Sequence, residues 1–329
     1  MKEVIILLVP TGVGKTSVSI ALAKSLNTEI ISADSMQIYR HMDIGTAKPT
    51  PKERSVVKHH MIDIVNPWEA FSTGKYIQAV VPIINELHGK GKIPLIVGGT
   101  GLYIKAMTKG IFSGPSADLS LREELLSMEK EETGLLYNLL KDLDPEAALR
   151  ITSNDTRRII RAVEVCIKSS SSISEMQKKL TMPLPYEFIK IGLNRDRKEL
   201  YRIIEKRVDE MIKRDLIEEV KHLLKMNPDR TPMQAIGYKE ISLYLRGEIS
   251  LEEAVMLIKR GTKRYAKRQL TWFKKEEGIN WIDMTGMYGT TMILNLIFNI
   301  LVCIPAFAGF KDSVIQGASE NKYLNPLSP

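Results

Sequence analysis

Hydrophobic and polar positions in the first hundred residues alternate between short, continuous apolar runs and segments with helical spacing. The apolar runs that predict strands are Val4–Val9, Glu29–Ser35, Met61–Val65 and Ile93–Val97. Ser17–Ser25 has the spacing of a helix that follows the first strand. Continuous apolar strands that alternate with helices are typical of a parallel sheet covered on both faces. The pattern therefore predicts an α/β fold with a parallel sheet.

After Gly114 the chain becomes helical and densely charged, with helical spacing over Asp118–Arg150 and Asp155–Lys168. Phe188–Leu193 then predicts a returning strand, and Lys198–Met226 a long amphipathic helix. We therefore expect a helical domain inserted into the sheet domain. The expected division is a catalytic core at 1–112 and 187–285, a helical insertion at 113–186 and a tail of unknown role at 286–329.

The most apolar stretch of the chain is Met292–Phe310, but Asn295, Asn299 and Pro305 interrupt it. A membrane span needs about 20 predominantly apolar residues, so we predict a packed or loosely ordered tail and expect no membrane association. Cys303–Ala308 is interpreted as an appendage outside the core. The apolar run at the N-terminus has only six residues, which is too short for a signal peptide.

Composition and charge narrow the class of protein. Hydrophobic residues make up 44% and charged residues 26% of the 329, which excludes collagen-like and wholly disordered chains. The net charge of +8 is compatible with a polyanionic partner but does not identify one. Cys166 and Cys303 form no CxxC or Cys/His cluster, which argues against a disulfide framework or a zinc site. A reducing, cytoplasmic location is expected.

The strongest chemical signal is a Walker-type phosphate loop between the first predicted strand and helix, formed by Val9, Pro10, Thr11, Gly12, Val13, Gly14, Lys15 and Thr16. Its two glycines let backbone N–H groups converge on phosphate oxygens, and the following helix adds its positive end. Lys15 supplies a point charge, and the Thr16 hydroxyl can ligate Mg²⁺. Val9 replaces the usual first glycine. We predict that this loop binds a di- or triphosphate group.

Two further polar loops, Asp34–Tyr39 and Gly98–Tyr103, follow predicted strands. Ligands of parallel sheets bind beyond the carboxyl ends of the strands, so these loops are expected beside the phosphate site. The Asp34 carboxylate could ligate a metal or accept a proton from an attacking nucleophile. It could equally cap a helix, and the residues alone leave these readings open. The Gly98-Gly99 pair could also simply end a strand.

Several segments together resemble one family. In chain order they are the phosphate loop, Asp34–Arg40, Gly45–Pro49, Gly98–Tyr103, Asn154–Val165, Ala235–Glu240 and Arg264–Phe273. This set is similar to the bacterial tRNA dimethylallyltransferases, the tRNA isopentenyltransferases of the MiaA type. A phosphate loop alone is shared by many nucleotide enzymes, but these segments in this order, over residues 4–284, are specific.

The resemblance implies a P-loop NTPase-like fold and transfer of a dimethylallyl group from its diphosphate to tRNA. The acceptor would be N6 of the adenosine 3′-adjacent to the anticodon, in tRNAs that read codons starting with U. Val9–Thr16 would bind the diphosphate, with Mg²⁺ on Thr16. Asp34 matches the general base, Thr100 a residue beside the target base, and Arg207 a diphosphate ligand. We expect a monomer whose partners are dimethylallyl diphosphate and tRNA.

The same resemblance implies a set of tRNA-contacting residues, namely Asp34, Ser35, Met36, Gln37, Thr100, Arg122, Arg157, Arg158, Ile159, Ile160, Arg161, Gln234, Gly237, Tyr238 and Lys239. The helical insertion at 113–186 would thus contact tRNA. By spacing alone, the arginines within 157–161 are equally typical of a solvated helix face. Lys259–Lys275 has eight basic residues and no acidic one, and could contact phosphates. The aromatic residues within it would contact the RNA or pack in the core.

Three alternative functions share some of these features. A small-molecule kinase of the shikimate or adenylate type has the phosphate loop but does not explain the late basic helix. An RNA-binding NTPase switch requires a water-positioning residue that the motifs lack. An isopentenyltransferase that acts on free adenine nucleotides does not need an RNA-binding insertion. The tRNA-modifying prenyltransferase accounts for all the motifs.

Overall fold

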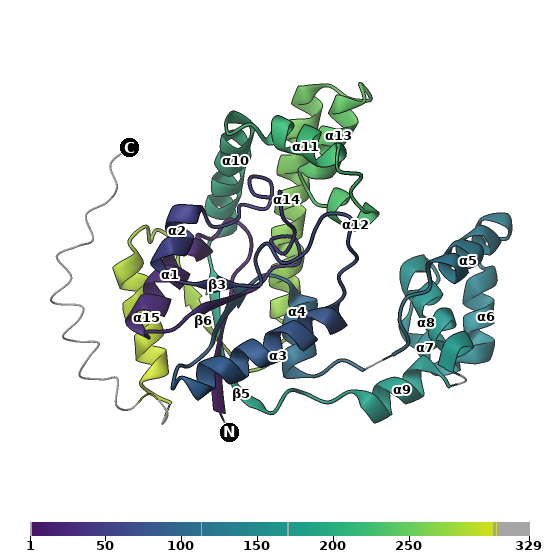
Figure 1. Cartoon of the computed structure of the whole chain (residues 1–329), viewed down its shortest axis with the longest axis horizontal. Helices are drawn as coiled ribbons and strands as arrows, with labels where there is room; N and C mark the ends of the chain where they lie inside the picture. The colour runs from purple at the N-terminus through teal and green to yellow at the C-terminus, as the bar shows by residue number, and fades with distance from the viewer. Residues whose placement is uncertain (1, 113, 170, 305–306, 308–329) are drawn as a thin grey trace. The chain divides into compact units, whose positions relative to one another are not determined.

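The structure is a computed structural model that describes residues 2–112, 114–169, 171–304 and 307. The chain divides into two compact units, the first comprising residues 1–104 and 185–329 and the second residues 105–184. The first unit combines a sheet with helices, whereas the second is helical (Figure 1). Helix α4 (Gly101–Thr108) spans the first boundary between them.

The first unit contains a six-stranded parallel sheet in the order β3-β2-β4-β1-β5-β6, so the predicted α/β fold class is confirmed. The strands are β1 (Lys2–Leu8), β2 (Ile30–Ala33), β3 (His59–His60), β4 (Leu95–Gly98), β5 (Tyr186–Asn194) and β6 (Ile279–Asp283). Residues 4–8 of β1 are fully buried because the strand lies between β4 and β5. This position explains the continuous apolar run at the N-terminus.

Two strands differ from the sequence-based prediction. The strand expected at Met61–Val65 is wrong, because Met61 and Asp63 have left-handed backbones with φ of 62° and 57°, which an extended strand cannot contain. The neighbouring strand β3 is His59–His60 instead. Strand β6 was not predicted, because Ile282 is its one buried residue and no apolar run marks it.

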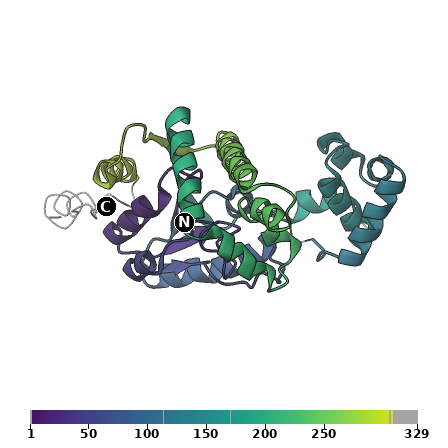
Figure 2. The same cartoon turned by 90° about the horizontal axis from the view of Figure 1, so that it is seen from above.

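Helices of the first unit surround this sheet. They are α1 (Lys15–Ser25), α2 (Pro51–Val56), α3 (Thr73–Gly89), α10 (Arg197–Lys213), α11 (Leu216–Leu224), α12 (Arg230–Met233), α13 (Tyr238–Leu245), α14 (Leu251–Phe273) and α15 (Thr290–Leu301). The single helix predicted at Lys198–Met226 is two helices, because Asp215 between them has a left-handed φ of 65°. Helices α10 and α14 lie side by side, as do α1 and α15 (Figures 1 and 2).

The C-terminal helix α15 completes the hydrophobic core. Its residues Ile297 and Leu301 are buried in the same cluster as Leu22 of α1, and Phe307 is buried there too. The interpretation of Cys303–Ala308 as an appendage is therefore wrong at Phe307; Pro305, Ala306, Ala308 and the rest of the predicted tail lie outside the described residues. The asparagines that interrupt the apolar run are exposed four residues apart, which makes α15 an amphipathic helix. Among the described residues no helix has the length and apolarity that crossing a membrane requires.

The second unit is a small helical bundle with its own core. Its helices are α5 (Leu119–Glu131), α6 (Leu135–Leu143), α7 (Pro145–Arg150), α8 (Thr156–Ser169) and α9 (Ile173–Leu180). The continuous helical spacing predicted over Asp118–Arg150 is broken at Gly134, where φ is 92°, and at Pro145. Asp144 caps α7 by accepting the Ala147 N–H at 2.9 Å. Buried side chains of α6 and α8 pack against each other.

Candidate active site

The loop between β1 and α1 has the backbone of an anion-binding site. Gly12 and Gly14 have φ of 87° and 97°, a region that glycine adopts without strain. Gly14 precedes α1 and makes no side-chain cap, so the first N–H groups of the helix have no intrahelical acceptor. Such N–H groups and the helix dipole favour a phosphate. A Cβ at Gly12 would lie 2.8 Å from Ile204 Cγ1, so α10 packs directly on the loop.

Val9 fits the first position of this loop without strain. It is not among the residues with positive φ, so its backbone does not require glycine. Its side chain is 1% exposed and belongs to the hydrophobic core. Its N–H donates to the Gly98 carbonyl oxygen at 3.1 Å, which joins the loops that follow β1 and β4. The departure from the usual pattern therefore extends the core and leaves the loop backbone in place.

Asp34 lies at the carboxyl end of β2 beside the phosphate loop. Its Oδ2 is 3.1 Å from the Lys15 Nζ. Its Oδ1 accepts the N–H groups of Met36 at 3.0 Å and Gln37 at 3.3 Å. One oxygen thus caps a turn, which is close to the structural interpretation of Asp34, and the other faces Lys15, which is compatible with the chemical one.

The electrostatics of this site keep Asp34 ionised. Burial raises the pKa of the Asp34 carboxyl, but the Lys15 ammonium and the two N–H donors outweigh it, so the pKa lies below the ordinary value. The charge of the same carboxylate also acts on Arg207 of α10. Burial lowers the pKa of the Arg207 guanidinium, and the charge of Asp34 opposes that effect. The structure therefore gathers two cations, Lys15 and Arg207, around one carboxylate.

Thr100 holds the Gly98–Tyr103 loop against the Asp34–Tyr39 loop. Its Oγ1 accepts the Ser35 N–H at 3.0 Å, and its own N–H donates to the Ala33 carbonyl oxygen at 3.1 Å. The structure thus brings four predicted residues to one edge of the sheet, namely Lys15 from the start of α1, Asp34 and Thr100 from the loops after β2 and β4, and Arg207 from α10.

Two residues of this edge were missed by the sequence reasoning, and both come from α14. The Gln269 side chain bridges the Thr11 N–H and the Gly99 carbonyl oxygen, each at 2.9 Å. Tyr265, one turn earlier on α14, lies next to Thr100 and Gln269. The signal that could have found Gln269 is its spacing, because it continues the buried face of α14 with an uncharged polar side chain among basic neighbours.

Part of the predicted tRNA-contacting segment Asp34–Gln37 is buried and bonded within the protein. Gln37 is 2% exposed, and its side chain bonds Ser32 and the carbonyl oxygens of Thr46 and Ala47, each at 3.3 Å. Ser35 and Met36 are half-buried. Side chains at 35 and 36 can therefore reach a ligand, whereas Gln37 fastens the Gly45–Pro49 loop to β2.

The predicted tRNA-contacting residues around α13 also include both exposed and buried side chains. Gln234 and Lys239 are exposed. Tyr238 is fully buried and donates its hydroxyl to Glu219 Oε1 at 2.5 Å. Gly237 has a φ of 98° and precedes α13. The side chains of Gln234 and Lys239 can therefore contact a ligand at the surface, whereas the Tyr238 side chain packs in the core.

In the helical unit the predicted residues form a separate cluster around a buried carboxylate. Glu164 has a fully buried side chain and pairs with Arg122 at 2.8 Å and Arg161 at 2.6 Å. Arg157 and Arg158 are exposed. Ile159 and Ile160, also predicted to contact tRNA, have their side chains in the core of this unit. The exposed part of the predicted arginine stripe is therefore 157 and 158.

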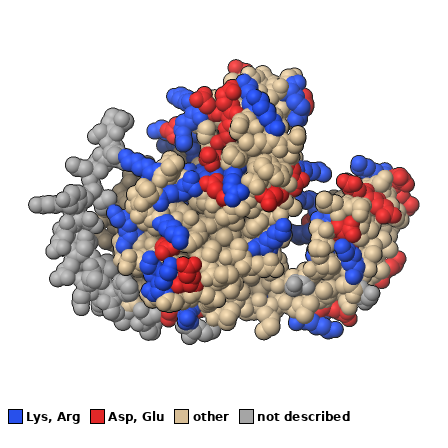
Figure 3. All heavy atoms as spheres, viewed as in Figure 1, with Lys and Arg blue, Asp and Glu red and all other residues tan. Residues whose placement is uncertain are grey.

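Helix α14 presents a basic surface beyond the phosphate loop. A hollow of about 480 Å³ is lined by Arg264, Lys267, Arg268, Thr271, Trp272 and Lys275. On the face drawn in Figure 3, basic and acidic side chains are intermixed among the described residues. The residues of this hollow include no acidic side chain, so it is locally suited to phosphates.

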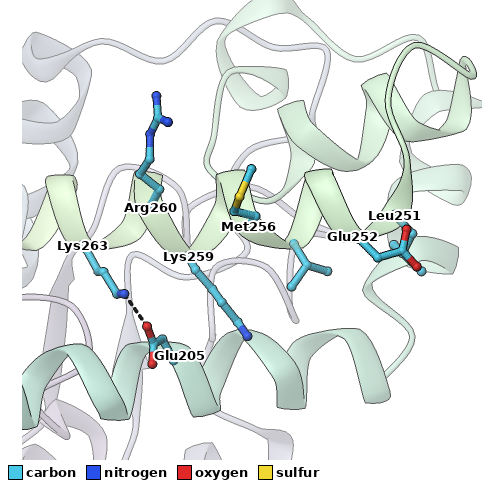
Figure 4. Close-up of a pocket in the computed structure, with 8 residues that line it drawn as sticks. Glu205, Leu251, Glu252, Met256, Lys259, Arg260 and Lys263 are labelled. Atoms are coloured by element: carbon cyan, nitrogen blue, oxygen red, sulfur yellow. Dashed lines mark hydrogen bonds and ion pairs between the residues drawn. The ribbon is translucent and has the colours of Figure 1, made fainter.

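A second hollow lies between α10 and α14 and has a different character. Lys259 and Lys263 point towards α10, and Lys263 pairs with Glu205 (Figure 4). Lys259 pairs with Asp209 at 2.6 Å. Arg260 and Met256 point away from α10 (Figure 4). These ion pairs neutralise two of the eight basic residues over 259–275 and hold the two helices together.

The described residues contain no cluster of three or more His, Cys, Asp and Glu side chains that could hold a metal ion. The residue predicted to ligate Mg²⁺, Thr16, is half-buried in the first turn of α1, next to Lys15. Magnesium is commonly held by one or two protein groups together with substrate phosphates and water, so this donor set fits it.

Comparisons with known proteins show which family the chain belongs to. The family model described as IPP transferase matches residues 37–276. The chain is 57% identical over 307 residues to a tRNA dimethylallyltransferase of Thermodesulfovibrio yellowstonii, covering 91% of this chain and 98% of that relative. It is 48% identical over 278 residues to the tRNA dimethylallyltransferase of Thermotoga maritima, covering 84% and 90%.

Solved structures show the same similarity. The tRNA isopentenylpyrophosphate transferase of Bacillus halodurans superposes with a TM-score of 0.67 at 42% identity, covering 91% of this chain and 96% of that one. A eukaryotic dimethylallyltransferase acting on tRNA superposes with a TM-score of 0.74 at 30% identity, covering 87% and 74%. With its family model, its relatives and its fold in agreement, the chain belongs to the IPP transferase family, as a tRNA isopentenyltransferase of the MiaA type.

Proposed function

We propose that the protein transfers the dimethylallyl group of dimethylallyl diphosphate to N6 of an adenosine in tRNA. The acceptor is the adenosine 3′-adjacent to the anticodon, in tRNAs that read codons starting with U. The observation that carries the proposal is the pairing of Lys15 with Asp34 at 3.1 Å. It supports a site in which Lys15 binds the diphosphate and Asp34 acts as the base. The proposed reaction takes place in the cytoplasm, on a monomeric enzyme.

The phosphate loop binds the leaving group. Backbone N–H groups at the start of α1, the Lys15 ammonium and the Arg207 guanidinium surround the diphosphate. As the allylic C–O bond breaks, its electron pair moves to the diphosphate oxygen, and these groups stabilise the charge that develops there. The Thr16 hydroxyl would hold Mg²⁺ together with diphosphate oxygens and water, and the ion would neutralise part of the same charge when bound.

Asp34 takes the proton from the acceptor amine. The lone pair of adenine N6 is delocalised into the ring, so the free amine is a weak nucleophile. When N6 attacks the allylic carbon it becomes cationic and strongly acidic, so that even a carboxylate of low pKa accepts its proton readily. An ionised Asp34 is therefore suited to this step, and Lys15 keeps it ionised.

Binding of tRNA requires contacts beyond the reacting base. To reach Asp34 the adenosine must leave its stack, which costs a few kcal/mol and least in a single-stranded loop. Ser35, Met36 and Thr100 line the edge of the sheet where the base would be held. The exposed basic side chains of α14, with Gln234 and Lys239, would contact the RNA backbone, as would Arg157 and Arg158 of the helical unit. Arg122 and Arg161 would add to that contact through their exposed parts.

The test is to incubate the protein with labelled dimethylallyl diphosphate and unmodified tRNA, then digest the RNA and identify the labelled nucleoside. Label is expected in one adenosine beside the anticodon. Free adenosine monophosphate is the matched control acceptor, and it should remain unlabelled. Label on the free nucleotide alone would make the protein a transferase of small adenine nucleotides.

A further inference from the structure

Helix α14 connects two loops that serve different halves of the reaction. Gln269 is 7% exposed, and its Oε1 accepts the Thr11 N–H at 2.9 Å. Its Nε2 donates to the Gly99 carbonyl oxygen at 2.9 Å. One backbone group is a donor and the other an acceptor, and a side-chain carboxamide carries both complementary groups at once. A buried lysine, leucine or ionised glutamate cannot make this pair of bonds.

The fit around this carboxamide is close. A Cβ at Gly99 would lie 2.1 Å from Gln269 Nε2, so the turn approaches the helix as nearly as its backbone allows. Tyr265, on the preceding turn of α14, lies next to both Gln269 and Thr100. The Gln269 carboxamide therefore connects the phosphate loop directly to the turn that carries Thr100.

We propose that Gln269 is a positioning residue, which holds the phosphate loop and the Gly99–Thr100 turn at a fixed separation. The inference rests on the proposed function, in which the first loop binds the diphosphate and the second lies beside the acceptor base. Reacting atoms must approach to about 3–3.5 Å, and a small misplacement lowers the rate of the chemical step. Loss of this bridge therefore acts on kcat more than on the binding of tRNA.

The test compares two substitutions on the same buried face of α14. Gln269→Met keeps the length and approximate volume of the side chain but removes both hydrogen bonds. Phe273→Leu, one turn later, removes volume from a fully buried position that has no part in the bridge. Gln269→Met should lower kcat about 10-fold or more and weaken binding of inorganic pyrophosphate about 3-fold, with the KM for tRNA within about 2-fold. Phe273→Leu should leave all three within about 2-fold when both variants are assayed below their melting temperatures.

A second variant tests the hydrogen-bonding requirement itself. Gln269→Glu places a carboxyl among the Thr11 N–H, the Gly99 carbonyl oxygen and the Tyr265 hydroxyl. A neutral carboxyl can donate to Gly99 and accept from Thr11, whereas the ionised form can only accept. The rate of this variant relative to wild type should therefore rise as the pH is lowered, while the same ratio for Gln269→Met stays constant.

Equal losses in Gln269→Met and Phe273→Leu, or a pH-independent ratio for Gln269→Glu, would overturn the inference. A wild-type protein that transfers no label contradicts the proposed function instead. Titration calorimetry with inorganic pyrophosphate still decides the role of Gln269 in that case. Weaker binding by Gln269→Met alone supports the bridge, and equal affinities in wild type and both variants overturn it as well.

Discussion

The two oxygens of the Asp34 carboxylate combine a structural role with the proposed chemical one. Oδ1 accepts two backbone N–H groups, which fixes the orientation of the side chain. Oδ2 faces Lys15 and stays available on the phosphate side. A base that is held by its turn loses little conformational entropy when the substrate binds, so the capping contact contributes to the placement of the reactive oxygen.

The substitution Asp34→Asn separates these roles. An asparagine oxygen can still accept the N–H groups of Met36 and Gln37, but the amide is no base. We expect kcat to fall about 10²–10⁴-fold, the loss typical of a removed general base, with tRNA affinity within a few-fold. Steady-state kinetics, tRNA binding and a melting curve on the same preparation check this. A large fall in melting temperature with an unchanged rate would reduce Asp34 to its capping role.

The pH dependence of the reaction should show the effect of Lys15 on the pKa of Asp34. Because the pKa of Asp34 is below its ordinary value of about 4, the carboxylate persists above that pH and activity is lost only as the pH falls through the lowered pKa. Lys15→Ala removes the cation that lowers this pKa while burial still raises it. The acid limb of kcat/KM should therefore move to higher pH, and the KM for the diphosphate substrate should rise.

The matched control for that profile is Lys24→Ala, an exposed lysine near the end of the same helix. Its acid limb and KM should equal those of the wild type. An acid limb that stays in place in Lys15→Ala would show that another group controls the low-pH loss.

At the residue scale, the sequence predicted what is contiguous and missed what is distant. The phosphate loop, Asp34 and Thr100 lie in short motifs whose chemistry is local, and the structure brings them together. Gln269 is 258 positions from Thr11 and 170 from Gly99, so no local pattern links them. Burial also could not be inferred for Tyr238, since an aromatic residue in a motif looks the same whether it packs inside or meets a ligand.

At the scale of elements, α14 has three functions along one helix. Its middle turns are held to α10 by ion pairs of Lys259 and Lys263, and the bridge at Gln269 lies near its C-terminal end. The basic residues that remain exposed belong mainly to its second half. Counting basic residues over 259–275 therefore overstates the charge available to a polyanion, because Lys259 and Lys263 are already paired. The subset that remains exposed on the helix includes Arg264, Lys267 and Arg268.

That subset should control the salt dependence of tRNA binding. Changing Arg264, Lys267 and Arg268 together to glutamine should reduce the slope of log affinity against log salt by about 2–3. Filter binding at several salt concentrations measures it. The control with the same change in charge is Lys206, Lys213 and Arg214 to glutamine, on exposed positions of α10 and the turn after it, which should leave the slope unchanged. Equal slopes in the two triple variants would remove α14 from the interface.

Boundaries of elements were less predictable than their existence. The long amphipathic pattern over Lys198–Met226 is real, yet Asp215 breaks it by adopting a left-handed backbone that aspartate tolerates better than most residues. Strand β6 was not predicted because its pairing with β5 uses backbone hydrogen bonds, which leave no side-chain pattern. Four of its five side chains are not buried.

At the scale of the whole molecule, the C-terminal helix is part of the fold of the phosphate site. Helix α15 packs on α1, whose first turn carries Lys15 and Thr16. Ile297 is fully buried in this contact. The sequence analysis set residues 286–329 apart because the recognised motifs end near residue 284. The exposed asparagines of α15 lie on the solvent side of a packed helix.

We expect Ile297→Ala to lower the free energy of unfolding by about 2–4 kcal/mol, as for other large-to-small changes in a core. Denaturant unfolding of wild type and variant measures it. Asn295→Ala is the control on the exposed face of the same helix and should change the stability by less than about 0.5 kcal/mol. An Ile297→Ala protein as stable as the control would place α15 outside the cooperative core.

Strand β1 pairs with two strands that lie far from it along the chain. Ile5 pairs with Leu95 and Lys2 pairs with Tyr186, so its β5 partner lies 184 positions after it. The glycines of the loop behind it are positioned by that strand and by Ile204 of α10. The backbone of this loop therefore depends on β5 and α10, and a fragment that ends before residue 186 lacks both of these supports.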